Sequence, residues 1–306
     1  MYYKGQDVET MRGMAESLLP FLEPFPTLIH EFINALLLRF PGQTALAQAV
    51  DLLLHDHFAR AAGLPLHQYL GIPNTKPLLS SFTIGLDEPR AVMEKVRRAE
   101  AYPILKIKLG GVNDLQLLRD IHAVSGKPVY VDANEGWTVE ETLRLLPECH
   151  RLNVQLVEQP LPRDDRQGYE RLQRWNDFPI PILLDESIHA PQDLARWAGI
   201  VQGVNIKLAK VGGIARAMEA IQEARRLDMK VMLGCMIESS LAVTAAAHLA
   251  PLADYLDLDG AELLADDPCD GVAFNHGRLQ LPTRPGIGAI WKHNTPSAAS
   301  LTESRD

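Results

Sequence analysis

The spacing of apolar residues divides the chain into two parts. Residues 7–23, 27–40 and 43–62 carry apolar side chains at the three- and four-residue intervals of an amphipathic helix. From residue 77 onwards, short β-branched or apolar runs alternate with amphipathic stretches instead. We therefore expect a helical N-terminal region followed by a longer α/β region.

The α/β region contains eight apolar runs that start roughly 25 residues apart, which is the length of a strand, a helix and two short loops. The runs are residues 78–86, 104–110, 128–134, 154–160, 181–187, 203–210, 230–236 and 255–263. Eight such units in succession predict a (β/α) TIM-type barrel. We expect the active site at the carboxyl ends of its strands.

An open, doubly wound sheet is the alternative arrangement, and it would hold its ligand at a glycine-rich turn or a strand-order switch. The glycine pair Gly212-Gly213 is not part of a GxGxxG motif, which favours the barrel. The expected organisation is a helical N-terminal region (1–76), the barrel (77–265), a return of the chain towards the N-terminal helices (266–291) and a disordered tail (292–306).

Composition and charge narrow the class of protein. Apolar residues make up 46% of the chain, and 39 acidic against 30 basic residues give a net charge of -9. This balance argues against a nucleic acid partner, whose phosphates demand a basic face. No signal peptide and no membrane span of roughly 20 apolar residues is visible. Cys149, Cys235 and Cys269 lie far apart without a CxxC pair, as expected in a reducing cytoplasm. These features predict a cytoplasmic protein without a membrane partner.

Three acidic residues close consecutive strand runs. Asp132, Glu158 and Asp185 each follow an apolar stretch, and in a barrel these positions face the active site. Three buried anions would repel one another and lose hydration, which a divalent cation would offset. Oxygen ligands without His or Cys favour Mg²⁺, or Mn²⁺, over Zn²⁺. Each residue could instead cap a helix, but three in register favour a metal site.

Lysines occupy the facing positions. Lys106 and Lys108 are two residues apart, so both point to the inner face of one strand, and Lys207 lies across the barrel. A lysine whose pKa is lowered by burial and nearby cations can act as a base. A metal would meanwhile stabilise negative charge on a substrate carboxylate. The alternative, a structural salt bridge to the acidic residues, is favoured for Lys210 and disfavoured for Lys108 and Lys207.

Six motifs occur in a fixed order: KIK (106–108), VDAN (131–134), VEQP (157–160), LDES (184–187), NIKLAKVGGI (205–214) and DLDG (257–260). Together they resemble the enolase superfamily, in its muconate-lactonizing subgroup. The resemblance implies that Asp132, Glu158 and Asp185 bind Mg²⁺. It further implies that Lys108 and Lys207 move a proton on opposite faces of the substrate α-carbon, while Lys106 neutralises the substrate carboxylate; this pairing of Lys and Mg²⁺ is known for enolase-type sites. One lysine on each face suits 1,1-proton transfer, which is racemisation or epimerisation.

The eighth run carries Asp257-Leu258-Asp259, and strand alternation directs both aspartates into the site. This DxD pattern is similar to that of dipeptide epimerases, where it binds the substrate's α-ammonium group. The resemblance thus implies an isomerase that epimerises a dipeptide such as L-Ala-D/L-Glu with Mg²⁺. The segment GCMIESSL (234–241) is also similar, and Glu238 either lines the pocket there or belongs to a helix cap at Ser239.

The resemblance implies that residues 1–76 are the helical part of a truncated N-terminal capping domain. Family members begin with an antiparallel β-meander that supplies a mobile loop over the site, whereas this sequence opens at a point that looks like the end of that meander. Without the loop, water exclusion is in doubt, and the exposed surface would favour a homo-oligomer. Two other functions stay open: lyase chemistry of the o-succinylbenzoate synthase or muconate cycloisomerase type, which Asp257 and Asp259 disfavour, and an inactive binding protein without a lid.

Overall fold

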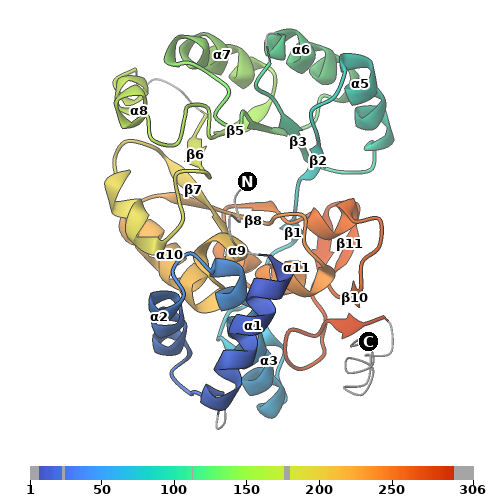
Figure 1. Cartoon of the computed structure of the whole chain (residues 1–306). Coiled ribbons are helices and arrows are strands. Elements are labelled where there is room, and N and C mark those ends of the chain that lie inside the picture. Colours follow the sequence, from blue (N-terminus) through green and yellow to red (C-terminus); the bar gives the residue numbers. More distant parts are fainter. Residues whose placement is uncertain (1–6, 23–24, 112, 176–179, 293–306) are drawn as a thin grey trace, which may run out of the picture.

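The computed structural model describes residues 7–22, 25–111, 113–175 and 180–292. Eight parallel strands form one sheet whose spatial order follows the chain (Figure 1). These strands are β2 (Phe82–Ile84), β3 (Leu105–Lys108), β4 (Val129–Asp132), β5 (Val154–Glu158), β6 (Ile182–Leu184), β7 (Gly203–Lys207), β8 (Lys230–Gly234) and β9 (Tyr255–Asp257). The backbone N–H of Ser81 donates to the carbonyl of Leu256 at 3.0 Å, which brings the two ends of the sheet together. Each predicted run contains one of these strands, so the TIM-type barrel is confirmed.

Alternation along the strands separates two cores. Side chains on one face, such as Leu105 and Ile107, pack in the main core against the helices. Side chains on the other face form a small core inside the barrel, built around Tyr130, Leu156 and Leu183. Because successive side chains point to opposite faces, the residues two positions further along these strands also point inward. These residues are polar, and their side chains point towards the active site.

Helical segments follow the strands around the barrel. They are α5 (Pro89–Arg98), α6 (Asp114–Ser125), α7 (Val139–Arg151), α8 (Arg166–Gln173), η2 (Pro191–Arg196), α9 (Leu208–Val211), α10 (Ile214–Arg226), α11 (Ser240–Ala247), η3 (Ala250–Leu252) and η4 (Gly260–Leu263). Helix α7 shows how locally these boundaries are encoded. Thr138 caps its first turn and Glu141 bonds back to the Thr138 backbone, a reciprocal capping box.

The N-terminal region is helical, as its apolar spacing predicts. It contains α1 (Val8–Leu18), η1 (Leu19–Phe21), α2 (Ile29–Arg39), α3 (Thr44–Ala61) and α4 (Leu66–Tyr69). Helices α1, α2 and α3 share a separate hydrophobic cluster around Ile33 and Leu54. Figure 1 shows these helices beside α9, α10 and α11. The buried Asp51 of α3 accepts hydrogen bonds from the backbone N–H groups of Ile214 (2.5 Å) and Ala215 (3.2 Å). An anion at a helix N-terminus is favourable, so α3 anchors the helical region to α10.

The first predicted run, residues 78–86, is two strands rather than one. Its start, β1 (Leu78–Leu79), pairs antiparallel with β12 (Arg278–Gln280), which pairs in turn with β11 (Ala273–Asn275). The ladder changes partner at the two serines, where Ser80 bonds the carbonyl of Gly277 and Ser81 that of Leu256. Only β2 therefore belongs to the barrel.

After the barrel, the chain runs back to the helical region. A second small sheet joins β10 (Cys269–Asp270) to β13 (Ile290–Trp291). Gly286 exchanges backbone hydrogen bonds with Leu64 and Leu66, and the Ile287 N–H donates to Asp56. Of the predicted tail, residues 292–306, all but Lys292 lie outside the described residues. Among the described helices, none has the length and apolar character needed to span a membrane.

Candidate active site

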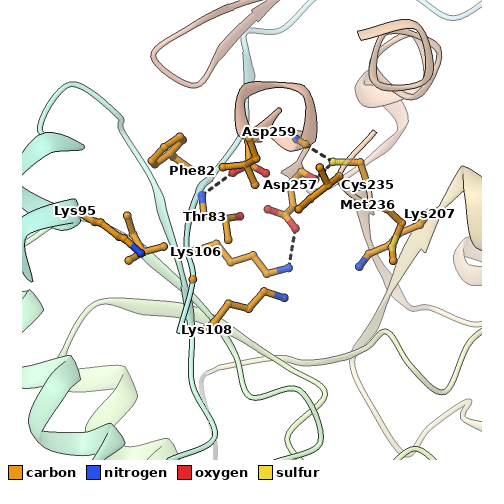
Figure 2. A pocket seen from close by; sticks show the side chains of 15 residues that line it. Phe82, Thr83, Lys95, Lys106, Lys108, Lys207, Cys235, Met236, Asp257 and Asp259 are labelled. Carbon is orange, nitrogen blue, oxygen red and sulfur yellow. Dashed lines mark hydrogen bonds and ion pairs between the residues drawn. The ribbon is translucent and has the colours of Figure 1, made fainter. Parts of the chain in front are cut away.

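A cavity of about 580 Å³ opens at the carboxyl ends of the strands. Five of the predicted site residues line it: Lys106, Lys108, Lys207, Asp257 and Asp259. Figure 2 shows their polar ends turned towards one another from β3, β7 and the end of β9. The structure therefore brings together residues that lie up to 153 positions apart in the sequence. The three predicted metal ligands lie next to this cavity, bonded to its lysines.

The ammonium group of Lys106 is the centre of the buried charges. Its Nζ lies 2.6 Å from Asp257, 2.7 Å from Glu158 and 3.2 Å from Asp132. Burial opposes the charged form, but the three carboxylates outweigh it and hold the pKa of Lys106 well above its usual value. Lys106 is therefore a fixed cation rather than a base.

Lys108 and Lys207 approach the cavity from opposite sides, from β3 and β7 (Figure 2). Lys108 lies 2.5 Å from Asp132 and its side chain is 27% exposed, whereas Lys207 lies 2.9 Å from Asp185 and is 7% exposed. Burial disfavours the ammonium form of Lys207, but the charge of Asp185 outweighs burial and raises its pKa. A group placed between the two lysines would meet one on each face.

The three predicted metal ligands close neighbouring strands. The register pairs Asp132 of β4 with Glu158 of β5, and Asp185 follows β6 directly. All three side chains are buried. Burial and the charge of Asp132 raise the pKa of Glu158 to about 7. For Asp185, burial acts in the same direction, but Lys207 and Lys210 outweigh it and lower the pKa. Glu158 is therefore the carboxylate of the three whose anionic form the surrounding residues stabilise least.

The chemistry of these donors fits a divalent cation. Glu158 Oε1 accepts from Asn205 Nδ2 at 2.7 Å, but the buried Oε2 has no hydrogen-bond partner, since its contact with Lys106 lacks hydrogen-bonding geometry. Carboxylate oxygens without His or Cys suit Mg²⁺. In the described part of the chain, however, no three Asp, Glu, His or Cys side chains are gathered into a metal-binding cluster. The lysines hold these carboxylates instead, and the ligand set stays a prediction.

The two aspartates after Tyr255 have different surroundings. Asp257 accepts hydrogen bonds from Ser81 Oγ at 2.8 Å and Lys106 Nζ at 2.6 Å. Asp259 accepts from the backbone N–H of Thr83 at 2.6 Å and forms no ion pair within the described residues. Burial and the charge of Asp257 raise the pKa of Asp259 to about 6. Above that pH, Asp259 is an anion at the cavity wall without a cation of its own.

Comparison with known proteins fits this arrangement. Residues 89–294 match the family model of enolase C-terminal domain-like proteins. The chain belongs to this family. The L-Ala-D/L-amino acid epimerase of Pedosphaera parvula is 41% identical over 250 residues, which cover 80% of this chain and 71% of that protein. The L-Ala-D/L-Glu epimerase of Bacteroides thetaiotaomicron is 33% identical over 292 residues, covering 94% and 75% of the two chains.

Solved structures of enolase-family proteins have the same fold. The dipeptide epimerase of Methylococcus capsulatus, complexed with Mg and the dipeptide L-Arg-D-Lys, superposes with a TM-score of 0.84. It is 31% identical in sequence, and the match covers 95% of this chain and 85% of that one. The family inferred from the six sequence motifs is thereby confirmed.

Three further residues singled out in the sequence of this enolase-family chain can be placed in the structure. The Glu238 carboxylate accepts hydrogen bonds from the backbone of Met236 (2.9 Å) and from Gln48 of α3 (3.1 Å), and it is not among the cavity-lining residues. Ser239 stands at the N-cap position of α11, but its side chain makes no capping bond. Lys210 lies 2.7 Å from Asp185, which is the structural salt bridge favoured from the sequence.

Sequence reasoning missed several residues that hold the enolase-family site together. Asn205 supports Glu158, and a signal existed, because Asn205 lies two positions before Lys207 and therefore on the same strand face. Gln159 accepts from the backbone N–H groups of Asp185 (2.9 Å) and Ser187 (3.2 Å), fixing the segment after β6. The sequence offers no comparable signal for the bonds of Gln159, which depend on how two strands meet.

Proposed function

We propose that this chain epimerises dipeptides by removing the α-proton on one face of the substrate and returning a proton on the other. The observation that carries this proposal is the placement of Lys108 and Lys207 on opposite sides of a cavity whose wall holds two aspartates. Structurally and sequentially related proteins that act on dipeptides support it. One lysine acts as the base and the other as the acid, and their roles exchange for the reverse reaction.

The fixed cation Lys106 faces the substrate carboxylate in this proposal. Asp132, Glu158 and Asp185 hold Mg²⁺, with Mn²⁺ as the alternative for the same oxygen donors. When bound, the metal supplies positive charge that stabilises the developing negative charge of the substrate carboxylate. In this structure the charge of Asp185 raises the pKa of Lys207, which favours the protonated form that donates a proton to the α-carbon.

Asp257 and Asp259 hold the α-ammonium group of the dipeptide. A pair of buried carboxylates is a strong acceptor for an ammonium group. Asp257 forms an ion pair with Lys106. Asp259 accepts a hydrogen bond from a backbone N–H and has no ion-pair partner within the described residues, so its carboxylate can bind the substrate ammonium group. Cycloisomerase and o-succinylbenzoate synthase substrates carry no ammonium group, and this pair would serve no purpose for them. Dipeptide epimerisation is therefore favoured over lyase chemistry on the same scaffold.

The domain organisation is part of the same proposal. The proposed cap is the N-terminal region (1–76), and residues 266–291 return to it, which the bonds of Gly286 and Ile287 to the segment from Asp56 to Leu66 support. Glu238 connects this cap to the active site, because its carboxylate receives the amide of Gln48 in α3. The cap thus holds the loop that follows β8.

The decisive experiment follows α-proton exchange. The full chain is incubated with a dipeptide panel and Mg²⁺ in D₂O, and deuterium incorporation and epimerisation are followed by NMR. We expect Lys108→Ala and Lys207→Ala each to abolish epimerisation. Residual exchange should be confined to one epimer, and to the opposite epimer in the other variant.

Lys230→Ala serves as the matched control, because Lys230 is exposed at the amino end of β8, away from the cavity. It should keep full activity. If no dipeptide exchanges its α-proton in protein shown by calorimetry to bind Mg²⁺, the proposal is wrong and a binding protein without turnover is supported. Exchange that persists equally for both epimers in both lysine variants would also contradict it.

A further inference from the structure

The part of the cavity beyond the charged groups is apolar. Five large side chains line it, here called the apolar wall: Phe82, Ile84, Met236, Ile237 and Leu263. Two of them remain substantially exposed, since Ile237 is 66% and Leu263 40% accessible to water. Large apolar side chains gathered at a cavity mouth indicate a surface that a ligand covers.

The apolar wall is held in place from behind. The ring of Phe82 stacks on Tyr102 with centroids 4.1 Å apart and planes 20° from parallel. Tyr102 in turn contacts Phe274, with centroids 6.1 Å apart. A ring fixed by such packing presents a preformed apolar surface, so little ordering is needed when a ligand binds.

Two charged side chains beside the apolar wall, Lys95 and Glu238, have partners within the protein. Lys95 lies 3.0 Å from Asp87, and Figure 2 shows it apart from the lysines that face the aspartates. The Glu238 carboxylate accepts hydrogen bonds from the Met236 backbone N–H and the Gln48 side-chain amide. Within the described residues, neither charge is therefore positioned to pair with an ionised substrate side chain.

We propose that the dipeptide substrates of this chain carry uncharged, apolar side chains. This inference rests on the proposed function and specifies its substrate class. An ionised side chain would lose hydration against the apolar wall without gaining a partner there. An apolar side chain instead removes its own surface and that of Ile237 and Leu263 from water.

The test compares catalytic efficiency across matched dipeptides. We expect kcat/KM for L-Ala-L-Leu to exceed that for L-Ala-L-Glu and L-Ala-L-Lys by roughly 10- to 200-fold, the range of discrimination between side chains in an apolar pocket. Equal or higher efficiency with Glu or Lys overturns the inference and leaves the proposed function standing. A complete absence of turnover across the panel overturns both.

A variant of the apolar wall locates the effect. Ile237→Asp should lower kcat/KM for L-Ala-L-Leu roughly tenfold and raise the ratio of L-Ala-L-Lys to L-Ala-L-Leu turnover. Leu38→Asp is the matched control, because Leu38 is 84% exposed on α2 and does not line the cavity. Both variants should keep the melting temperature of the parent protein. If both give the same substrate ratio as the parent, the apolar wall does not select the side chain.

Discussion

The buried charges and the apolar wall belong to one cavity, but they differ in charge and in exposure to water. The buried charges, namely Lys106, Lys207, Asp132, Glu158 and Asp185, are each bonded to an opposite charge. The apolar wall lies partly in loops, and its members Ile237 and Leu263 are open to water. The fold must pair the buried charges in order to be stable, whereas it leaves Ile237 and Leu263 of the apolar wall exposed to water.

We therefore assign the reaction chemistry to the buried charges and the choice of substrate side chain to the apolar wall. A buried carboxylate that loses its lysine keeps an uncompensated charge, so changes among the buried charges affect folding and chemistry together. Exposed side chains carry few native contacts, and substitutions there have small effects on stability. We therefore expect variants of the two groups to fall into distinct classes, with effects that decrease from the buried charges to the cavity mouth.

The largest effect is expected at Lys207. Lys207→Met removes the proton carrier on one face of the substrate, and kcat/KM should fall roughly 10²- to 10⁴-fold, the usual contribution of a general acid or base. Asp185 keeps its bond to Lys210, so the fold should persist, as circular dichroism would show. A loss below tenfold would mean that Lys207 only balances charge.

The next effect is expected at Asn205. Asn205→Ala removes the hydrogen bond to Glu158 Oε1, and loss of such a support typically weakens metal affinity by roughly 10- to 100-fold. Titration calorimetry with Mg²⁺ measures this without reference to activity. Asn275→Ala, on the exposed strand β11, is the control. Unchanged Mg²⁺ affinity in Asn205→Ala would argue against Glu158 as a metal ligand.

A smaller effect is expected from pH through Asp259. Burial and the charge of Asp257 raise its pKa to about 6, so Asp259 is neutral below that pH and anionic above it. KM for a dipeptide should therefore rise as the pH falls from 8 to 5. Asp259→Asn should raise KM by roughly tenfold at pH 8 and flatten this dependence. A KM that rises equally in parent and variant would assign the titration to another group.

The smallest effect is expected at Lys95. Its exposed ion pair with Asp87 contributes little, so Lys95→Met should change kcat/KM for any dipeptide less than about threefold. Steady-state kinetics with L-Ala-L-Leu and L-Ala-L-Glu provide the check. A selective loss of L-Ala-L-Glu turnover would show that Lys95 leaves Asp87 to bind acidic substrates. Selectivity would then depend on a charged side chain as well as on the apolar wall.

The sequence predicted the barrel and the placement of its cavity-lining residues because both follow from strand periodicity. Lys106 and Lys108 share a face since they are two residues apart, and their outward neighbour Ile107 packs in the main core. Asp257 and Asp259 reach the cavity as expected. Each of these inferences needs only the local alternation of a strand and the knowledge that barrel sites lie at strand ends.

The contacts that periodicity does not encode escaped prediction. Lys106 bonds carboxylates from three other strands, which depends on the register of β3, β4, β5 and β9 together. Glu238 meets Gln48 across 190 positions of sequence, and this bond ties the loop after β8 to α3. The apolar wall combines β2, the loop after β8 and the segment after β9, whose shapes no local pattern describes.

The hydrogen bonds of the returning chain have a consequence for biosynthesis. Asp56 and Ile287 are bonded although 231 positions separate them. At a ribosomal rate of about 5–20 residues per second, the donor is made roughly 12 to 46 seconds after the acceptor. Throughout that interval the helices α3 and α4 are present without Gly286, whose backbone Leu64 and Leu66 will bond. The surface that the returning chain covers is therefore open to water until the final segment has emerged.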